Sequence, residues 1–334
     1  MKRTINIPIF VSHQGCPNDC VFCNQKRITG IRNEETEEQI RQKIERFLST
    51  CRTSGAEKEI AYFGGSFTGI EEEKQLMYLR IAQAYIQRGE VKGIRVSTRP
   101  DYMDQKICER LYRNHVTTIE LGVQSADDEV LRMNRRGMKA SAVETAVAYI
   151  RKYPFSLGLQ MMTGMLGSDE EKDLFTAQEL IRLKPDFVRI YPTVVLRDTA
   201  LYDLYLQGKY VPMELEDSVR LSAELLELFE SAGIPVIRLG LMAGEEVHEK
   251  EVAGPYHSAY RELVESYRIC RTVEHALDGK QTMGKELEIV CAPSMVSKVI
   301  GNRRKNVLLW QEKYGVRVHI VQDREEQNFR IRLL

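Results

Sequence analysis

The chain has 334 residues, of which 43% are hydrophobic and 29% charged, and its 48 basic residues are balanced by 48 acidic ones. This composition is ordinary for a globular protein with one large domain and a smaller second unit, and it excludes a largely disordered chain. The zero net charge excludes a general attraction to nucleic acids or membranes, so any site for a polyanion must be local.

The amino-terminal segment and the cysteines indicate a soluble cytoplasmic protein with a metal site. The first apolar stretch is too short for a signal-peptide core, and no later run is long enough to span a membrane. Three of the seven cysteines, Cys16, Cys20 and Cys23, lie within eight positions, whereas the other four are scattered. In a reducing compartment such a group favours a metal site over disulfide bonds.

Short apolar or β-branched runs alternate with amphipathic stretches along most of the chain. The runs predict strands at residues 5–11, 59–63, 94–98, 117–123, 155–161 and 187–191, with a further candidate at 236–239. The amphipathic stretches predict helices at residues 35–50, 72–88, 103–113, 141–152, 170–183 and 216–232. Repeated strand–helix units predict parallel strands joined by crossover helices, in either a doubly wound sheet or a partial barrel.

The three neighbouring cysteines follow the first predicted strand in a C-x3-C-x2-C loop. Cys thiolates are the usual ligands of iron–sulfur clusters, and three of them leave one iron of a four-iron cluster open for a substrate or cofactor. The alternative is a zinc site with His13 as the fourth ligand, but zinc sites usually carry a second ligand pair. The spacing therefore favours a catalytic [4Fe–4S] cluster.

This loop, with Phe22 directly before Cys23, resembles the signature of the radical S-adenosylmethionine (SAM) superfamily. The resemblance implies an α/β fold with a partial (βα)6 TIM-like barrel, in which the open iron binds the methionine part of SAM. In that family, reductive cleavage of SAM gives a 5′-deoxyadenosyl radical that abstracts a hydrogen atom from the substrate. Phe22 is then a cofactor-binding candidate, and the protein orients the reactants and excludes water.

Polar and glycine motifs follow the later strands, at the edge where either parallel architecture places its active site. Gly64, Gly65 and Ser66 resemble the segment that meets the methionine amino group in radical SAM enzymes, although many members carry Glu in place of Ser66. The other motifs resemble the radical domain of the Elongator catalytic subunit and the oxygen-independent coproporphyrinogen oxidase group. They imply cofactor contacts at Ser97, Arg99, Gln124 and Gln160, and catalytic candidates at Arg189, Tyr191 and His257.

Several of these motifs also have a purely structural interpretation. Paired glycines often form a simple turn after a strand, and Asp101 is predicted to cap a helix that starts near Met103. A lone histidine such as His257 is more often structural or solvated than catalytic. The sequence contains neither an acetyltransferase segment nor a second group of three cysteines, so neither the full Elongator reaction nor methylthiotransfer is expected.

The segment at residues 296–321 resembles a KH module, in which a turn between two helices clamps single-stranded nucleic acid. From Lys285 onward the tail holds 10 basic and 6 acidic residues, and Arg304 stands where the second glycine of the KH turn would be. The alternative is a solvated helix end in a small packing domain. The resemblance implies RNA contacts at Lys298, Gly301, Asn302, Arg303, Arg304 and Lys305.

Together these features predict a radical SAM partial barrel (1–245), a helical extension with a linker (246–283) and a KH-like α+β domain (284–334). The leading hypothesis is an enzyme that modifies RNA, with tRNA as a candidate substrate, and that receives electrons from a flavodoxin- or ferredoxin-type donor. The alternatives are a small-molecule radical enzyme of the coproporphyrinogen oxidase type and a non-catalytic, metal-bound RNA-binding protein. No membrane partner is expected.

Overall fold

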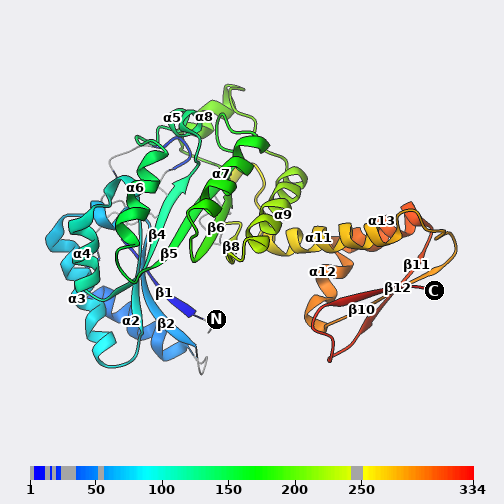
Figure 1. Cartoon of the computed structure of the whole chain (residues 1–334), viewed down its shortest axis with the longest axis horizontal. Coiled ribbons are helices and arrows are strands. Elements are labelled where there is room, and N and C mark those ends of the chain that lie inside the picture. The colour runs from blue at the N-terminus through cyan, green and yellow to red at the C-terminus, as the bar shows by residue number, and fades with distance from the viewer. Residues whose placement is uncertain (1–3, 12–15, 17–19, 24–34, 52–55, 242–250) are drawn as a thin grey trace.

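The larger part of the protein is built on a curled sheet of seven parallel strands (Figure 1). The computed structural model of the chain describes residues 4–11, 16, 20–23, 35–51, 56–241 and 251–334. The strands lie in the sheet in the order β1 (Thr4–Phe10), β2 (Glu57–Phe63), β3 (Gly93–Thr98), β4 (Val116–Gln124), β5 (Ser156–Thr163), β6 (Phe187–Pro192) and β8 (Val236–Leu239). The predicted partial TIM-like barrel is confirmed, and the candidate strand at 236–239 forms one edge of it.

Amphipathic helices cover the outer face of this sheet (Figure 1). In α9, for example, Leu221, Leu225 and Phe229 recur at helical spacing and are almost fully buried. Each of the six predicted helices of this region is present, and its ends lie within two residues of the predicted range. They are α2 (Glu37–Thr50), α3 (Glu72–Gln87), α4 (Gln105–Arg113), α6 (Ser141–Ile150), α7 (Glu170–Arg182) and α9 (Leu215–Ser231).

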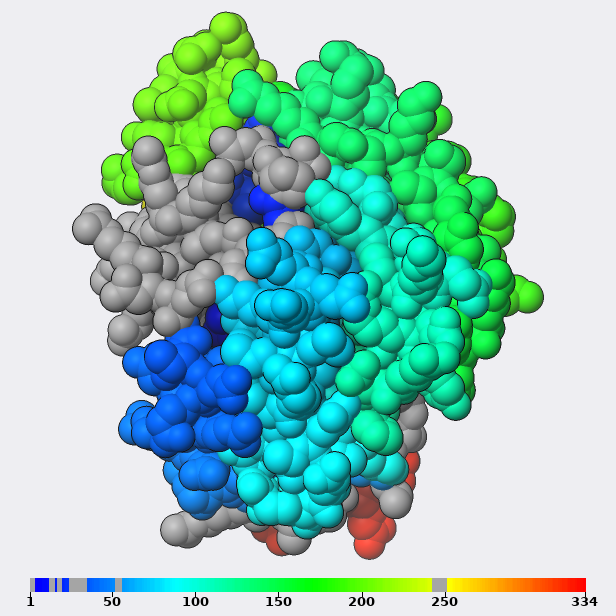
Figure 2. All heavy atoms as spheres, turned by 90° about the vertical axis from the view of Figure 1, so that its left-hand side faces the viewer, coloured from blue at the N-terminus to red at the C-terminus, as the bar shows by residue number. Residues whose placement is uncertain are grey.

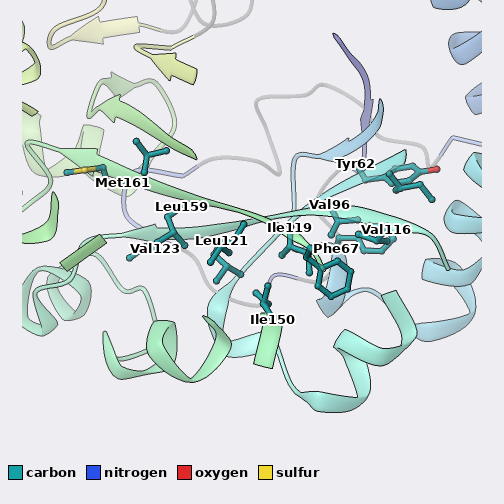
Figure 3. Packing of buried hydrophobic residues seen from close by; sticks show 14 of the residues in the cluster. Tyr62, Phe67, Val96, Val116, Ile119, Leu121, Val123, Ile150, Leu159 and Met161 are labelled. Atoms are coloured by element: carbon teal, nitrogen blue, oxygen red, sulfur yellow. The ribbon is translucent and has the colours of Figure 1, made fainter. Parts of the chain in front are cut away.

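Alternate residues of the central strands face opposite sides of the sheet. In β4, Ile119, Leu121 and Val123 belong to the main hydrophobic core (Figure 3). Thr118 and Glu120 alternate with them and line the concave inner side. Because side chains alternate along a strand, one set builds the core under the helices and the other gives the barrel a polar interior.

The start of α4 differs from the prediction. Asp101, the predicted cap of this helix, lies in a short 3-10 turn (Pro100–Tyr102) and pairs with Arg99 instead. The helix begins at Gln105, where the carboxylate of Asp104 accepts a hydrogen bond from the Ile107 amide at 2.7 Å. The prediction for Asp101 is wrong because the chain completes a separate turn before it enters the helix.

Besides short 3-10 turns, four short helices and strands of the described residues have no counterpart in the sequence prediction. They are α5 (Asp128–Met133), β7 (Val195–Leu196), α8 (Ala200–Leu206) and β9 (Glu251–Ala253), and β7 pairs with β9 in an antiparallel ribbon. Val21, Val195, Leu201 and Tyr210 are buried together in a small cluster, which we call the loop core. Since Val21 lies between Cys20 and Cys23, this cluster links the cysteine loop to the new elements.

The carboxyl-terminal part follows a long helix, α11 (Tyr260–Leu277), as predicted (Figure 1). Tyr260 and Val264 of α11 belong to the main core, whereas Val273 and Leu277 belong to a second core. The predicted division into segments 1–245, 246–283 and 284–334 stays a prediction. The middle segment contains α11, whose residues belong partly to the main core and partly to the second core. The tail continues with β10 (Glu286–Cys291), α12 (Val296–Ile300), α13 (Lys305–Tyr314), β11 (Arg317–Gln322) and β12 (Phe329–Leu333).

The three strands of the tail form their own sheet, in the order β11, β10, β12. β10 pairs in parallel with β11 and antiparallel with β12. The order strand, helix, helix, strand, strand is that of an α+β unit with a turn between two helices, while the KH resemblance itself stays a prediction.

Candidate active site

A cavity of about 1480 Å³ occupies the concave side of the sheet. In Figure 2, blue atoms from near the amino terminus lie in a hollow between atoms of the region around α8 and those of the region around α5. Most of the predicted site residues meet in the wall of this cavity, although they come from the cysteine loop and five different strands or strand ends. They are Cys16, Cys20, Phe22, Cys23, Gly64, Gly65, Ser97, Arg99, Gln124, Gln160, Arg189 and Tyr191.

The cysteine loop is held by backbone hydrogen bonds on both sides. The Val21 amide donates to the Asn134 carbonyl at 3.2 Å, and the Leu201 amide donates to the Val21 carbonyl at 2.7 Å. The loop therefore lies between the end of α5 and the start of α8. Phe22 packs against the loop core, so its side chain helps to anchor the loop as well as to line the cavity.

Two buried arginines place positive charge beside the cysteines. Arg136 Nη1 lies 3.8 Å from the Cys20 sulfur, and Arg99 Nη2 donates to the Arg136 carbonyl at 2.6 Å. Burial alone would lower the pKa of Arg99, but its ion pair with Asp101 and the charges of the Cys16 and Cys20 thiolates raise that pKa overall. These guanidinium groups place positive charge where an anionic, thiolate-bound metal site would lie.

This environment fits an iron–sulfur cluster with its cofactor. The Nη1 atom of Arg99 is buried with no hydrogen-bond partner among the described residues, and it lines the same cavity as the three cysteines. A buried N–H of this kind suits an anionic ligand, such as a cluster with thiolate ligands or a carboxylate. Within the part of the chain that the structure describes, no three His, Cys, Asp or Glu side chains meet around a single point that would suit one metal ion.

Ser66 lies behind the cavity wall rather than in it. Its side chain is fully buried, shares a hydrogen bond of 2.8 Å with the Thr98 hydroxyl and accepts another from the Arg99 amide at 3.2 Å. Gly64 and Gly65 do line the cavity, and Gly64 has a φ of +93° that side chains rarely tolerate. Ser66 therefore fixes the end of β3, and Gly64 and Gly65 are the residues of this motif that face the cavity.

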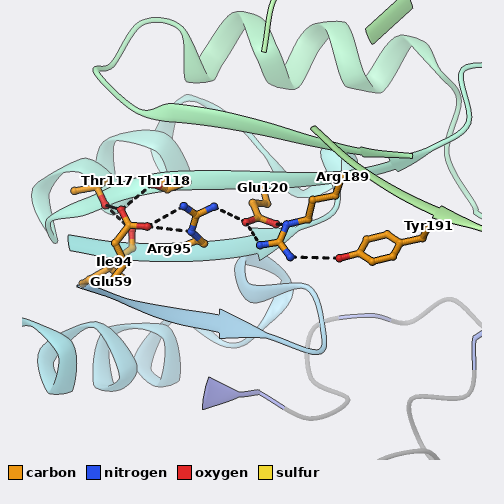
Figure 4. A network of polar contacts seen from close by, with 8 residues as sticks. All are labelled: Glu59, Ile94, Arg95, Thr117, Thr118, Glu120, Arg189 and Tyr191. Atoms are coloured by element: carbon orange, nitrogen blue, oxygen red, sulfur yellow. Dashed lines mark hydrogen bonds and ion pairs between the residues drawn. The ribbon is translucent and has the colours of Figure 1, made fainter. Parts of the chain in front are cut away.

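An ionic network crosses the floor of the cavity (Figure 4). Glu120 accepts hydrogen bonds from Arg95 Nη1 at 2.6 Å and from Arg189 Nη2 at 2.9 Å. Arg95 also donates to Glu59 at 3.0 Å, and Arg189 Nη1 donates to the Tyr191 hydroxyl at 3.3 Å. Buried charges need such partners, so the network keeps a polar interior stable and fixes the position of Tyr191.

Sequence reasoning missed Glu59, Arg95 and Glu120 as parts of this site. Each of them is a charged residue at an alternate position of a strand that is otherwise apolar on its helix side. That alternation was the available signal, because a charge in a central strand of a parallel sheet must face a polar interior or a partner.

The structure places His257 outside the cavity wall. Its Nδ1 atom accepts a hydrogen bond from the Ala259 amide at 3.1 Å, just before α11. This contact gives His257 a local role at the start of the helix.

The predicted RNA-binding residues of the tail do not share one environment. Lys298 pairs with Glu265 of α11 at 2.6 Å, and Lys305 pairs with Glu216 of α9 at 2.5 Å. Asn302, Arg303 and Arg304 are exposed, and both arginines have positive φ angles, of 51° and 64°. A side chain at Gly301 would come within 3.0 Å of Asn306, so this glycine permits a tight turn.

None of the helices in the described ranges is both long and apolar enough to cross a membrane.

Comparisons with known proteins match most of the part that holds the cavity. The family described as the radical SAM superfamily matches residues 10–180, and the radical SAM C-terminal domain matches residues 185–268. Among solved structures, the archaeal Elp3 of Methanocaldococcus infernus, lacking its N-terminus, aligns with a TM-score of 0.65 at 21% identity. That alignment covers 81% of this chain and 64% of the other.

Curated relatives are similar over shorter stretches. The tRNA uridine(34) acetyltransferase of Methanocaldococcus jannaschii is 32% identical over 129 residues, which is 38% of this chain and 24% of that protein. Human Elongator complex protein 3 is 29% identical over 210 residues, which is 57% of this chain and 38% of that protein. The chain therefore spans well under half the length of either relative.

Proposed function

The chain belongs to the radical SAM superfamily, whose enzymes use a [4Fe–4S] cluster and SAM, and we propose that this enzyme modifies RNA, with tRNA as its substrate. The observation that carries the proposal is the cavity, whose wall brings the three cysteines together with fixed charges of the sheet. A wall that combines hydrogen-bonding groups with apolar side chains suits a nucleobase. The similarity to a tRNA uridine(34) acetyltransferase supports the same substrate class.

In this proposal Cys16, Cys20 and Cys23 hold the cluster, and Arg99 and Arg136 stabilise the charge of the thiolates. The backbone at Gly64 and Gly65 and the side chains of Ser97, Gln124 and Gln160 bind the cofactor from the carboxyl ends of the strands. When bound, the cluster and SAM together supply an electron and a 5′-deoxyadenosyl radical for hydrogen abstraction. Phe22 shields the loop from water.

Arg189 and Tyr191 then face the substrate. Both side chains line the cavity, and the ionic network orients Arg189 so that its remaining donor holds the Tyr191 hydroxyl. Such preorganised polar groups position a substrate without having to rearrange during the reaction. Electrons reach the cluster from a flavodoxin- or ferredoxin-type donor.

In the same proposal the tail contributes RNA contacts through its exposed turn, chiefly Arg303 and Arg304. Phosphate contacts of this kind would orient the RNA while the cavity takes the base.

A small-molecule radical enzyme is the second candidate. The observation that favours it is the pairing of Lys298 and Lys305 with acidic residues of α11 and α9, which suits a tail that only packs. The non-catalytic alternative is set aside, because the family is one of enzymes.

The test is reconstitution of the full chain with iron and sulfide under anaerobic conditions. We expect four irons per chain, formation of 5′-deoxyadenosine on reduction, and a modified nucleoside in tRNA only in the presence of the wild-type protein. A Cys20→Ala variant should lose both products. Bound zinc in place of iron would contradict the mechanism, and 5′-deoxyadenosine formation with no change in any tRNA nucleoside would favour the small-molecule candidate.

A further inference from the structure

The wall of the cavity carries an excess of guanidinium groups. It holds six arginines and no lysine, against four carboxylates, although the whole chain has no net charge. Guanidinium groups bind carboxylate and phosphate oxygens through paired donors. We therefore ask, for each of these arginines, which anion offsets its charge. The six are Arg95, Arg99, Arg135, Arg136, Arg189 and Arg238.

Three of the six are attached to the cysteine loop. Arg136 lies beside the Cys20 sulfur, the carbonyl of Arg135 lies 3.8 Å from the same sulfur, and Arg99 donates to the carbonyl of Arg136. The guanidinium groups of Arg136 and Arg99 therefore lie on the side of the cavity where the cluster and its cofactor belong, whereas Arg135 contacts the loop through its carbonyl and is an exposed residue.

Two more arginines are neutralised within the floor of the cavity. Arg95 is shared between Glu59 and Glu120, and Arg189 is bound to Glu120. The charges of these guanidinium groups are already offset by Glu59 and Glu120, so they fix the shape of the floor and leave little capacity for a new anion.

Arg238 is the remaining arginine of the sheet, and a bulge turns it into the cavity. The register between β6 and β8 shifts so that Val188 faces Val236 but Arg189 faces Arg238. One extra residue, Ile237, is thereby accommodated on β8, and both Ile237 and Arg238 line the cavity although they are consecutive. Bulges commonly re-aim a side chain in this way next to a functional site.

No carboxylate of the described residues forms an ion pair with Arg238. It lies directly across from Arg189, and two like charges on neighbouring strands repel each other. Glu120 offsets the charge of Arg189, whereas nothing among the described side chains offsets that of Arg238. An arginine that is aimed into a cavity under these conditions is ready to bind an oxyanion.

We propose that Arg238 forms an oxyanion subsite at the open edge of the partial barrel, and that it binds a phosphate of the RNA substrate. This inference rests on the proposed function and names a contact by which the nucleic acid is held. The carboxylate of SAM offers similar oxygen chemistry. Arg238 lies on β8, the edge strand opposite β1, which leads into the cysteine loop, and the parallel measurement of SAM affinity decides between the two sources.

The test compares the reconstituted full chain with Arg238→Gln, Arg238→Lys and a control, Arg113→Gln. Arg113 is 73% exposed on the outer helix α4, so its loss removes one charge far from the cavity wall. The binding of labelled, unfractionated tRNA is measured over a range of salt concentrations. The affinity for SAM and the formation of 5′-deoxyadenosine without RNA are measured in parallel.

For Arg238→Gln we expect tRNA binding to weaken about tenfold. The negative slope of log K against log salt should become shallower by about one, and the affinity for SAM should stay unchanged. Arg238→Lys should keep the wild-type slope, and Arg113→Gln should behave as wild type. Unchanged tRNA binding by Arg238→Gln would overturn the subsite but not the proposed function. A loss of SAM affinity alone would assign the subsite to the cofactor and also overturn it, whereas a wild-type protein that binds no tRNA would remove both.

Discussion

Gly158 is the residue that allows the ionic floor to form. Arg189 and Glu120 belong to β6 and β4, and Gly158 of β5 stands between these strands, paired in register with both Glu120 and Phe187. A Cβ atom at this position would lie 2.2 Å from the Phe187 ring and 3.1 Å from Cγ of Glu120. The missing side chain thus lets an ion pair reach across a whole strand.

Gly158→Ala is accordingly predicted to destabilise the protein by about 1–3 kcal/mol, because the Phe187 ring and Glu120 must both move. Urea unfolding at neutral pH measures this loss. Gly279 provides the matched control, since a Cβ atom there has no neighbour within 4 Å; it has a φ of +72°, so Gly279→Asn, which tolerates that backbone, is the suitable change. An unchanged free energy of unfolding for Gly158→Ala would contradict this account of the floor.

Asp173 gives a second prediction at this scale, because no cation among the described residues forms an ion pair with its buried carboxylate. It is 1% exposed and accepts hydrogen bonds from the Gly164 amide at 2.8 Å and the Ser168 hydroxyl at 2.6 Å. Burial raises the pKa of Asp173 from 3.8 to about 6 despite these two bonds. The folded state thus holds the proton to a higher pH than the unfolded state does.

The contribution of this group to stability is fully present below the unfolded pKa and is lost as the pH rises through the folded pKa. The loss amounts to roughly 3 kcal/mol and persists at higher pH. Asp173→Asn should therefore be more stable than the wild type near neutral pH, and this advantage should disappear in acid. Urea unfolding as a function of pH measures it, with the exposed Glu171→Gln as a control, and a less stable Asp173→Asn at neutral pH would refute the prediction.

Among the elements, α5 and α8 matter most, because the cysteine loop lies between them. Leu201 of α8 is fully buried in the loop core, and its amide binds the carbonyl of Val21. The packing of Leu201 therefore helps to hold the cysteine loop in place.

Leu201→Ala is predicted to reduce the iron retained after anaerobic reconstitution and desalting, because a cavity in the loop core loosens the loop. A buried Leu→Ala change costs about 2–5 kcal/mol where it cannot relax. The control is Leu277→Ala in the second core, which should lower thermal stability to a similar extent and leave the iron content intact. Equal iron loss in both variants would mean that the effect is general unfolding.

The elements also show how far sequence reasoning reaches. The strands and the long helices of the barrel could be predicted, because their periodicity extends over many residues, as in α9. The cysteine loop could be recognised because Cys16, Cys20 and Cys23 are neighbours in the chain. The short elements α5, β7, α8 and β9 could not, since a few residues carry too little periodicity to stand out.

The site could be predicted only in part, because many of its contacts join segments that are far apart in the sequence. Glu120 binds Arg189 across 69 positions of sequence, and Val21 meets both Asn134 and Leu201. No local pattern encodes such pairs, because they depend on which strands become neighbours. Arg189 and Tyr191 were reached through a family resemblance, whereas their partners needed the fold.

For the whole molecule, the basic residues predicted to bind RNA fall into two groups, according to whether they form ion pairs with α11 and α9. Lys298 and Lys305 are paired with acidic residues, whereas Arg303 and Arg304 are exposed. Exposed ion pairs contribute little stability, but they compete with any phosphate for the same charge.

If the tail binds RNA, the double variant Arg303→Gln/Arg304→Gln should lower tRNA affinity at least tenfold and reduce the salt slope by about two. Lys298→Gln should change both quantities less, because its charge is already offset by Glu265. Binding of labelled tRNA at several salt concentrations measures the difference. Equal effects of the paired and the exposed residues would count against this assignment.

The helix α11 joins the two hydrophobic cores without a break, and this has a mechanical consequence. Because one continuous helix contributes side chains to both cores, a rotation of α11 about its axis would also rotate the tail. Each residue inserted into the middle of α11 would turn the tail by about 100° and advance it by about 1.5 Å. Inserting about four residues, close to one full turn, would nearly restore the orientation of the tail relative to the barrel. Any activity that depends on this orientation should therefore vary periodically with the number of inserted residues.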